Sequence, residues 1–169
     1  VSSSCCALHP GWSTPTTISP SIGSFVPDKL MPYTTYRTLP EGIAMFVYCC
    51  ADLLFGTKVR STAEALSLPC RPARDVEALN KRLQQVDDGK LNEPVTGVVV
   101  DMDLGETALE LIAASKAHDA AMPVVAFGSH VATALLNAAR EAGADFVMPR
   151  SMFTNTLPDV LMRVSGKAE

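Results

Sequence analysis

Five short apolar segments, each followed by a stretch with helical spacing, run from residue 45 to about residue 166. Four of these segments fit buried strands, because they are short, contain β-branched or aromatic residues, and are bounded by polar residues, whereas the second, LPCRPAR, is a weak strand. They cover residues 45–51, 68–74, 95–100, 123–128 and 145–149. The predicted helices cover residues 52–68, 76–85, 106–120, 130–144 and 151–166. Few folds accommodate so regular an alternation.

Strands that are apolar on both faces indicate a parallel sheet covered by helices on each side. Because crossovers between parallel strands are right-handed, the result is a doubly wound α/β fold with a five-stranded sheet. Local signals agree: Asp75 is a predicted N-cap, Gly143 a predicted C-cap, and Pro158 falls in the first turn of the last helix. The first helix is expected to bury one face, made of Leu53, Leu54, Val59, Ala63 and Leu66.

The first 44 residues differ from the rest of the chain. Nearly half of residues 1–40 are Ser, Thr or Pro, and the stretch shows neither helical nor strand period. Such a composition is typical of a disordered tail, so we predict two parts: a tail at 1–44 and an α/β domain at 45–169. The chain begins with Val1, and Met45 directly precedes the first strand. This predicts that residues 1–44 are an over-extended gene start.

Composition limits the partners and the compartment. A formal net charge of −4 gives no support for nucleic-acid binding, and no apolar run approaches the roughly 18 residues of a membrane span. The five cysteines include no CxxC pair, which argues against a zinc site. Cys49 and Cys50 lie in an apolar run, so the simplest interpretation is that they are small core residues, with a redox or metal role as the alternative. We expect a cytoplasmic protein.

In doubly wound folds the functional site lies at the carboxyl ends of the strands. The segments that follow the five predicted strands should therefore meet in space. They contribute Asp52, the pair Arg74 and Asp75, the pair Asp101 and Asp103, the sequence Gly128-Ser129-His130, and the pair Arg150 and Ser151.

Three short sequences carry a resemblance to a known family. GADFVMPRSMF, PVVAFGSH and VVVDMDLG are similar to the fifth, fourth and third strand regions of response-regulator receiver domains. The resemblance covers residues 45 to about 165. It implies a flavodoxin-like sheet with strand order 2-1-3-4-5, and a signalling role in which a protein kinase or a regulatory target is the partner.

The same resemblance implies a phosphoacceptor site. Asp101 falls on the phosphoacceptor position, and Mg²⁺ would be the cofactor, held by Asp101 and by an acid pair after the first strand. Here the acid pair falls on Cys50 and Ala51, with Asp52 one place late as a substitute metal ligand. The hydroxyl position falls on Gly128 and the lysine position on Arg150. These departures predict an Asp101–Arg150 ion pair that imitates an occupied site, and so a degenerate pseudo-receiver acting by protein–protein interaction.

Other interpretations of these residues stay open. Asp101 is a working phosphoacceptor in one of them. In another, a small anionic metabolite or a nucleotide binds at the strand ends, although no Gly-rich nucleotide loop is present. The candidate residues for this site are Ser129, His130 and Arg150, together with Arg71, Arg74 and Ser151. Two plainer interpretations make Ser129 the N-cap of the fourth helix and Asp103 the N-cap of the third. No GxSxG motif is present, so we expect no enzyme activity.

Overall fold

The computed structural model describes residues 44–87, 90–91 and 93–167. All of the predicted tail except its last residue lies outside these residues, so the two-part division and the over-extended start stay predictions. Strands β1 (Met45–Cys49), β2 (Cys70–Pro72), β5 (Val95–Asp101), β6 (Val124–Gly128) and β7 (Phe146–Pro149) form one sheet in the order β2-β1-β5-β6-β7. Every neighbouring pair is parallel. Counted along the chain this order is 2-1-3-4-5, so the predicted doubly wound, flavodoxin-like fold is confirmed.

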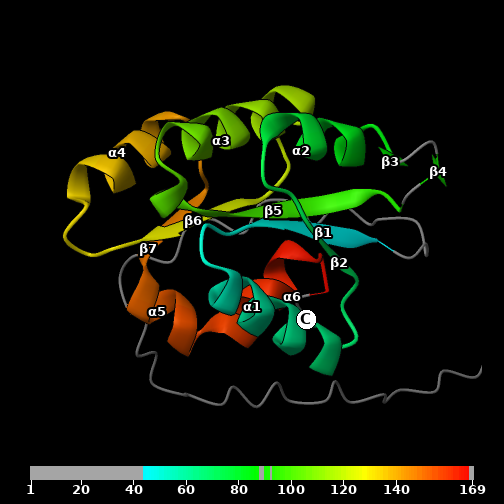
Figure 1. Ribbon diagram of the computed structural model, residues 1–169, viewed down its shortest axis with the longest axis horizontal. Helices are drawn as coiled ribbons and strands as arrows, with labels where there is room; N and C mark the ends of the chain where they lie inside the picture. Colours follow the sequence, from blue (N-terminus) through cyan, green and yellow to red (C-terminus); the bar gives the residue numbers. More distant parts are fainter. Residues whose placement is uncertain (1–43, 88–89, 92, 168–169) are drawn as a thin grey trace, which may run out of the picture. The chain divides into compact units, whose positions relative to one another are not determined.

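Helices cover both faces of the sheet (Figure 1). One face carries α1 (Leu53–Ala65), α5 (Arg150–Asn155) and α6 (Leu157–Val164), and the other carries α2 (Val76–Leu83), α3 (Glu106–His118) and α4 (Thr133–Glu141). A short 3₁₀ helix, η1 (Met102–Leu104), joins β5 to α3. A small antiparallel pair, β3 (Val86–Asp87) and β4 (Lys90–Leu91), precedes β5 and has no counterpart in the sequence prediction.

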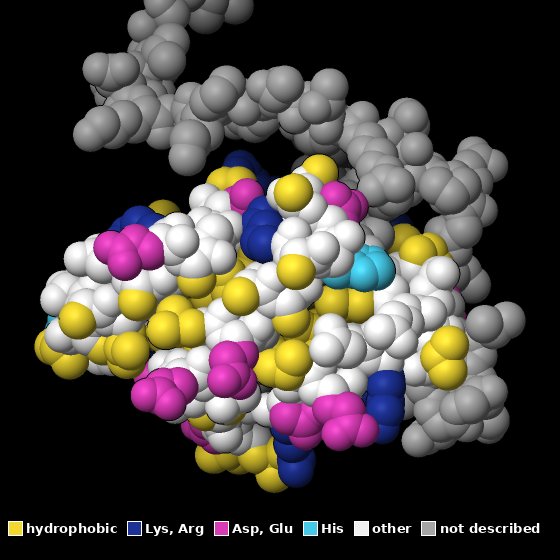
Figure 2. Space-filling model, turned by 90° about the horizontal axis from the view of Figure 1, so that it is seen from above, with side chains coloured by type: hydrophobic (Ala, Val, Ile, Leu, Met, Phe, Trp, Pro, Cys, Tyr) yellow, Lys and Arg dark blue, Asp and Glu magenta, His cyan; other side chains and the backbone are white. Residues whose placement is uncertain are grey.

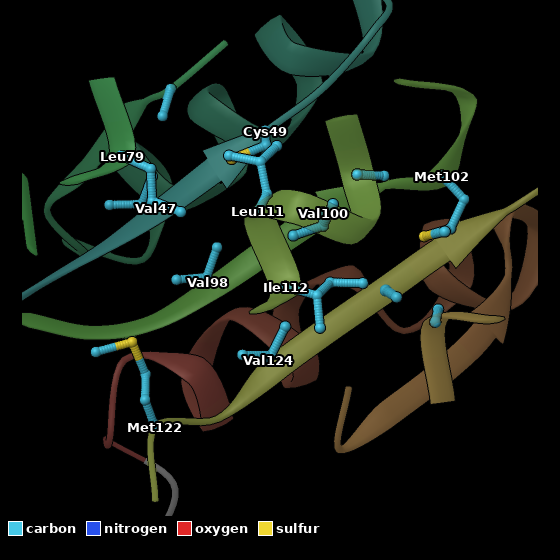
Figure 3. Packing of buried hydrophobic residues seen from close by; sticks show 14 of the residues in the cluster. Val47, Cys49, Leu79, Val98, Val100, Met102, Leu111, Ile112, Met122 and Val124 are labelled. Atoms are coloured by element: carbon cyan, nitrogen blue, oxygen red, sulfur yellow. The ribbon is translucent and has the colours of Figure 1, made fainter. Parts of the chain in front are cut away.

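Each face of the sheet has its own hydrophobic cluster. Under α2, α3 and α4, valines of β5 and β6 point toward Leu111 and Ile112 of α3, and Cys49 of β1 is fully buried beside them (Figure 3). Under α1, α5 and α6, Phe127 and Phe153 are among the largest buried side chains. Cys49 is therefore a core residue, as its apolar surroundings predicted. Among the described residues visible from the α2–α3–α4 side, the Lys and Arg side chains are scattered (Figure 2).

The predicted start of α2 and the predicted end of α4 are confirmed, and the predicted last helix is divided in two. Asp75 caps α2 by accepting a hydrogen bond from the Ala78 N–H. Gly143, at a φ of 102°, follows the end of α4, and the N–H groups of Gly143 and Ala144 reach back to carbonyls of the last turn. Pro158 lies in the first turn of α6, but the predicted last helix is broken at Thr156 into α5 and α6. No helix of the described residues is long and apolar enough to cross a membrane.

The burial predicted for the first helix is wrong at its start. Val59 and Ala63 are buried, but Leu53 and Leu54 are 75% and 81% exposed. Both leucines belong to the first turn of α1, where the chain has just left the carboxyl end of β1. The helical spacing places these side chains on one face, but the sheet and the other helices do not extend far enough to cover that first turn.

Candidate functional site

The candidate site lies between the carboxyl ends of β1 and β5, where the strand order changes direction. Neighbouring crossovers leave this point on opposite faces of the sheet, which opens a crevice in folds of this type. Asp101 ends β5 at this point, and its side chain is 0% exposed. Its Oδ2 accepts a hydrogen bond from the Ala51 N–H at 3.3 Å, and its Oδ1 accepts one from the Asp103 N–H at 3.1 Å. The buried carboxylate is therefore bonded to the segments that follow both strands.

Arg150 bridges two carboxylates at this site. It is the first residue of α5, directly after β7, and its side chain is 32% exposed. Its Nη2 atom donates to Oδ1 of Asp101 at 2.7 Å and to Oδ2 of Asp103 at 2.8 Å. Burial alone would lower the pKa of Arg150, but the two carboxylates outweigh it, and the pKa is raised above its usual value. The predicted Asp101–Arg150 ion pair is thus present, and Asp103 shares it.

Aromatic side chains hold the guanidinium from the other side. The guanidinium carbon of Arg150 lies 5.4 Å from the ring centre of Phe55 and 5.8 Å from that of Phe127. Phe127 stacks on Phe153, with ring centres 4.1 Å apart and an interplanar angle of 2°. Cation–π attraction and this stack fix both the orientation of Arg150 and the position of the short helix α5. No local sequence pattern indicates these aromatic partners, since the contacts join residues far apart in the chain.

Cys50 occupies the edge of the site in place of an acid. Burial raises the pKa of Cys50 to about 12, and the Asp101 charge adds to this effect while the Arg150 charge opposes it. The thiol therefore stays protonated near neutral pH and is a poor ligand for a hard cation. Cys50 also packs partly against the cluster under α1, which agrees with the interpretation as a core residue.

The residues present do not fit a magnesium ion in this arrangement. Asp52 caps α1 by accepting from the Leu54 N–H at 2.8 Å, and the Arg150 guanidinium is bonded to Oδ1 of Asp101. Within the described residues, no three or more His, Cys, Asp or Glu side chains are placed to hold a metal ion. The proposed metal ligands Asp52 and Asp101 are therefore engaged with other groups.

Gly128 also has a structural reason to lack a side chain. A Cβ atom built on it would lie 2.9 Å from the Cβ of Met102, which is closer than real Cβ contacts allow. Met102 is fully buried directly after Asp101, so a serine or threonine hydroxyl at position 128 would need the η1 segment to move. The lack of a side chain at Gly128 thus leaves room for Met102.

Two predicted helix caps are wrong. The N-cap position of α4 is Ala132, without a side-chain hydrogen bond, because the helix begins at Thr133 and leaves Ser129 in the preceding loop. The N-cap position of α3 is Gly105, and Asp103 turns to Arg150 instead. An ion pair with a half-buried guanidinium has replaced the capping bond that the sequence suggested.

The candidate anion-binding residues do not form one cluster of bonded side chains. In the described part of the chain, neither Ser129 nor the exposed His130 makes a side-chain hydrogen bond to Arg150. Arg71 belongs to β2, and Arg74 follows it, whereas Arg150 follows β7 at the opposite edge of the sheet. The strand order therefore separates the two groups of arginines that the sequence could place together.

Comparisons with known proteins support the fold only. No family model matches the sequence, and no curated protein matches it. The receiver domain of NtrX from Brucella abortus matches with a TM-score of 0.58 at 17% identity, over 73% of this chain and 99% of that domain. The Mn²⁺-bound response regulator Rcp1 matches with a TM-score of 0.59 at 12% identity, over 76% of this chain and 98% of Rcp1.

A longer NtrX structure from Brucella abortus, in complex with ADP, matches with a TM-score of 0.57 at 18% identity. The match covers 72% of this chain but only 26% of that NtrX chain, so this chain spans about a quarter of it. The chain therefore has the fold of response-regulator receiver domains, as the three sequence similarities implied.

Proposed function

We propose that this chain, which has the receiver fold, is a signalling or regulatory protein that acts by protein–protein interaction without phosphorylation of Asp101. The observation that carries the proposal is the ion pair of Asp101 with Arg150, 2.7 Å long and made to a fully buried carboxylate. A carboxylate must offer a free oxygen to attack a phosphoryl group, and a cation must neutralise the incoming charge. In this chain the guanidinium bonds Oδ1 and neutralises the charge of the carboxylate, while Oδ2 accepts a hydrogen bond from the Ala51 N–H.

Other features of the site support the same conclusion. The Cys50 thiol and the Ala51 methyl group supply no hard oxygen ligand, and Gly128 supplies no hydroxyl for a phosphoryl oxygen. Arg150 differs from a lysine because its planar guanidinium lies against the Phe55 ring while Nη2 donates to two carboxylates. Each departure taken alone would weaken phosphoryl transfer, and together they leave a bonded, static centre.

An ion pair that is always formed implies that the surface around α5 keeps one conformation. Receiver-like signalling needs a segment that changes position, and the ion pair with the aromatic stack holds α5 in a single place. We infer that the protein presents this surface to a partner protein in all conditions, and that its activity is set by how much protein is present. No catalytic step is part of this proposal.

The experiment is incubation with acetyl phosphate and Mg²⁺, followed by intact mass measurement. We expect no added phosphoryl group on the wild-type chain. The variant Arg150→Ala frees Oδ1 of Asp101, and it should also remain unmodified, because Cys50 and Ala51 still supply no oxygen ligand for a cation. A phosphoryl group that appears on the wild type and disappears in Asp101→Asn would overturn the proposal and favour a phosphorylatable regulator.

Nucleotide binding is tested separately, since one NtrX structure holds ADP. A thermal-shift series with ADP, ATP and inorganic phosphate should leave the midpoint of unfolding unchanged, because the charge of Arg150 is already neutralised by two carboxylates. Stabilisation by ADP that is lost in Arg150→Ala would support the alternative, a small-anion site at the carboxyl edge.

A further inference from the structure

Large exposed hydrophobic side chains lie mainly just after the carboxyl ends of the strands. Six such residues are exposed in the described part of the chain. Four of them closely follow the carboxyl end of a strand, whereas Val86 and Phe146 lie elsewhere. The four are Leu53, Leu54, Val131 and Met152, which we call the apolar rim. Single exposed hydrophobic residues are ordinary, so the notable feature is that four of the six follow strands at the same end of the sheet.

Three residues of the rim, Leu53, Leu54 and Met152, come from the segments that hold the Asp101–Arg150 ion pair. Leu53 and Leu54 form the first turn of α1, and the next residue, Phe55, contacts the Arg150 guanidinium. Met152 belongs to α5, two residues after Arg150. Phe55 and Phe153 have ring centres 5.9 Å apart, which places the start of α1 beside α5. The loops leading from β1 to α1 and from β7 to α5 lie at the same end of the sheet (Figure 1).

The rim is also acidic. The segments at the carboxyl ends of β1, β5, β6 and β7 contain four carboxylates and one guanidinium. The carboxylates are those of Asp52, Asp101, Asp103 and Glu106, and the guanidinium is that of Arg150. Arg150 is shared by two of them, and Asp52 and Glu106 are both exposed and make no ion pair within the described residues. An apolar surface with surplus negative charge fits a partner that carries apolar side chains flanked by positive ones.

We propose that the apolar rim binds a basic amphipathic helix of a partner protein, a proposal that rests on the interaction role proposed above. A helix presents apolar side chains at a spacing of three and four residues with Lys or Arg beside them. An extended partner strand would need an open strand edge, but the rim is built from loops and helix starts, and the open edges belong to β2 and β7. The carboxylates supply the complementary charge.

A second copy of this chain fits the rim less well. Two-fold pairing of rim against rim would place carboxylates opposite carboxylates, which costs binding energy. An anionic lipid surface would be repelled for the same reason. These two occupants therefore become outcomes that the experiment must distinguish from the helix.

The experiment uses the full chain and two synthetic peptides of about 18 residues, five turns of helix. One peptide carries Leu and Lys in an amphipathic pattern, and the other has every Lys replaced by Glu. Calorimetric titration should show binding of the Leu/Lys peptide only. Leu53→Ser with Leu54→Ser should weaken it at least about tenfold, as expected when buried apolar contacts are lost. Val86→Ser, an exposed hydrophobic residue outside the rim, is the matched control and should bind as the wild type does.

Charge is tested by Asp52→Asn with Glu106→Gln, since asparagine still caps α1. This variant should bind the Leu/Lys peptide several-fold more weakly, and added salt should reduce the difference. Equal binding of both peptides, unchanged affinity in the leucine variant, or concentration-dependent dimers that the leucine variant abolishes would each overturn the proposal. Phosphorylation of Asp101 would instead overturn the proposed function, so the two failures are distinguishable.

Discussion

Arg150 and Asp101 are 49 residues apart in the chain and are joined by a 2.7 Å ion pair at the carboxyl edge of the sheet. The carboxylate is fully buried, while the guanidinium is partly exposed and shared with Asp103. Because the two partners come from β5 and from the start of α5, the pair ties two distant segments together. Its removal should affect stability as well as any chemistry of the site.

Replacing Arg150 by alanine should therefore destabilise the protein. The change leaves the Asp101 carboxylate buried without its charged partner, which costs about 2 to 4 kcal/mol in the free energy of unfolding. Asp103→Asn should cost less than about 1 kcal/mol, because Asp103 is 43% exposed. Urea unfolding of both variants measures the difference. Equal losses in the two variants would contradict the assignment of Asp101 as the buried partner.

Oxygen ligands can be supplied to the site by substitution. Cys50→Asp and Ala51→Asp together with Arg150→Lys restore the residue types that the receiver resemblance implies at these positions. We expect the triple variant to bind Mn²⁺, because carboxylates are hard ligands and lysine releases one carboxylate oxygen. Titration of Mn²⁺ followed by calorimetry checks this. The same variant with Asp101→Asn is the control, and binding that survives in it would place the cation elsewhere.

Alkaline pH should weaken the fold through the buried thiols. Burial raises the pKa of Cys50 to about 12 from a usual value of 9.0, and it raises that of Cys49 as well. A raised pKa in the folded state gives stability that is complete below the unfolded pKa and is lost as pH rises toward the folded one. Between about pH 9 and 12 the free energy of unfolding should fall.

Urea unfolding at about pH 8 and about pH 10.5 tests this window. Because other groups also titrate there, the comparison is with Cys50→Ala, in which the fall should be smaller than in the wild type. An identical fall in both proteins would show that Cys50 ionises as freely in the folded chain as in the unfolded one.

The stack of Phe153 on Phe127 should be a major contributor to stability. Phe153→Ala removes a fully buried ring and leaves a cavity, so we expect a loss of about 3 to 5 kcal/mol. Phe153→Leu keeps most of the volume and should lose less than half of that. Thermal and urea unfolding measure both changes. A small loss in the alanine variant would mean that α5 closes over the cavity.

Two glycines offer a contrast in packing. A Cβ at Gly97 would lie 2.8 Å from the carbonyl oxygen of Val164, a backbone atom that cannot turn away, so Gly97→Ala should be strongly destabilising. A Cβ at Gly56 in α1 would meet its nearest neighbours at 3.6 and 3.7 Å, an ordinary contact. Gly56→Ala should stabilise the protein by up to about 1 kcal/mol through helix propensity. Midpoints of thermal unfolding would rank the two variants, and the reverse order would contradict this packing.

The fold could be predicted because the spacing of apolar residues within each short segment indicates whether it is a strand or a helix. Continuous apolar runs such as residues 97–100 fit a central strand buried on both faces, and the strand–helix alternation leaves few topologies. The break at Thr156 and the small β3–β4 pair were missed, because short elements carry weak periodic signals. The exposure of Leu53 and Leu54 was also missed, since helical spacing shows which face a residue lies on but not where the covering elements end.

Part of the candidate site could also be predicted from the sequence. Strand ends in a doubly wound sheet must share one edge, so Asp101 and Arg150 could be placed close together from their positions alone. The role of Asp103, the aromatic rings beside Arg150, and the match of Gly128 with Met102 depend on contacts between segments far apart in the chain. The sequence alone determined the fold, through the periodicity of its apolar residues, and it determined which residue types follow the carboxyl ends of the strands. Which atoms finally touch there is set by packing, because a shift of one residue or one rotamer changes every partner.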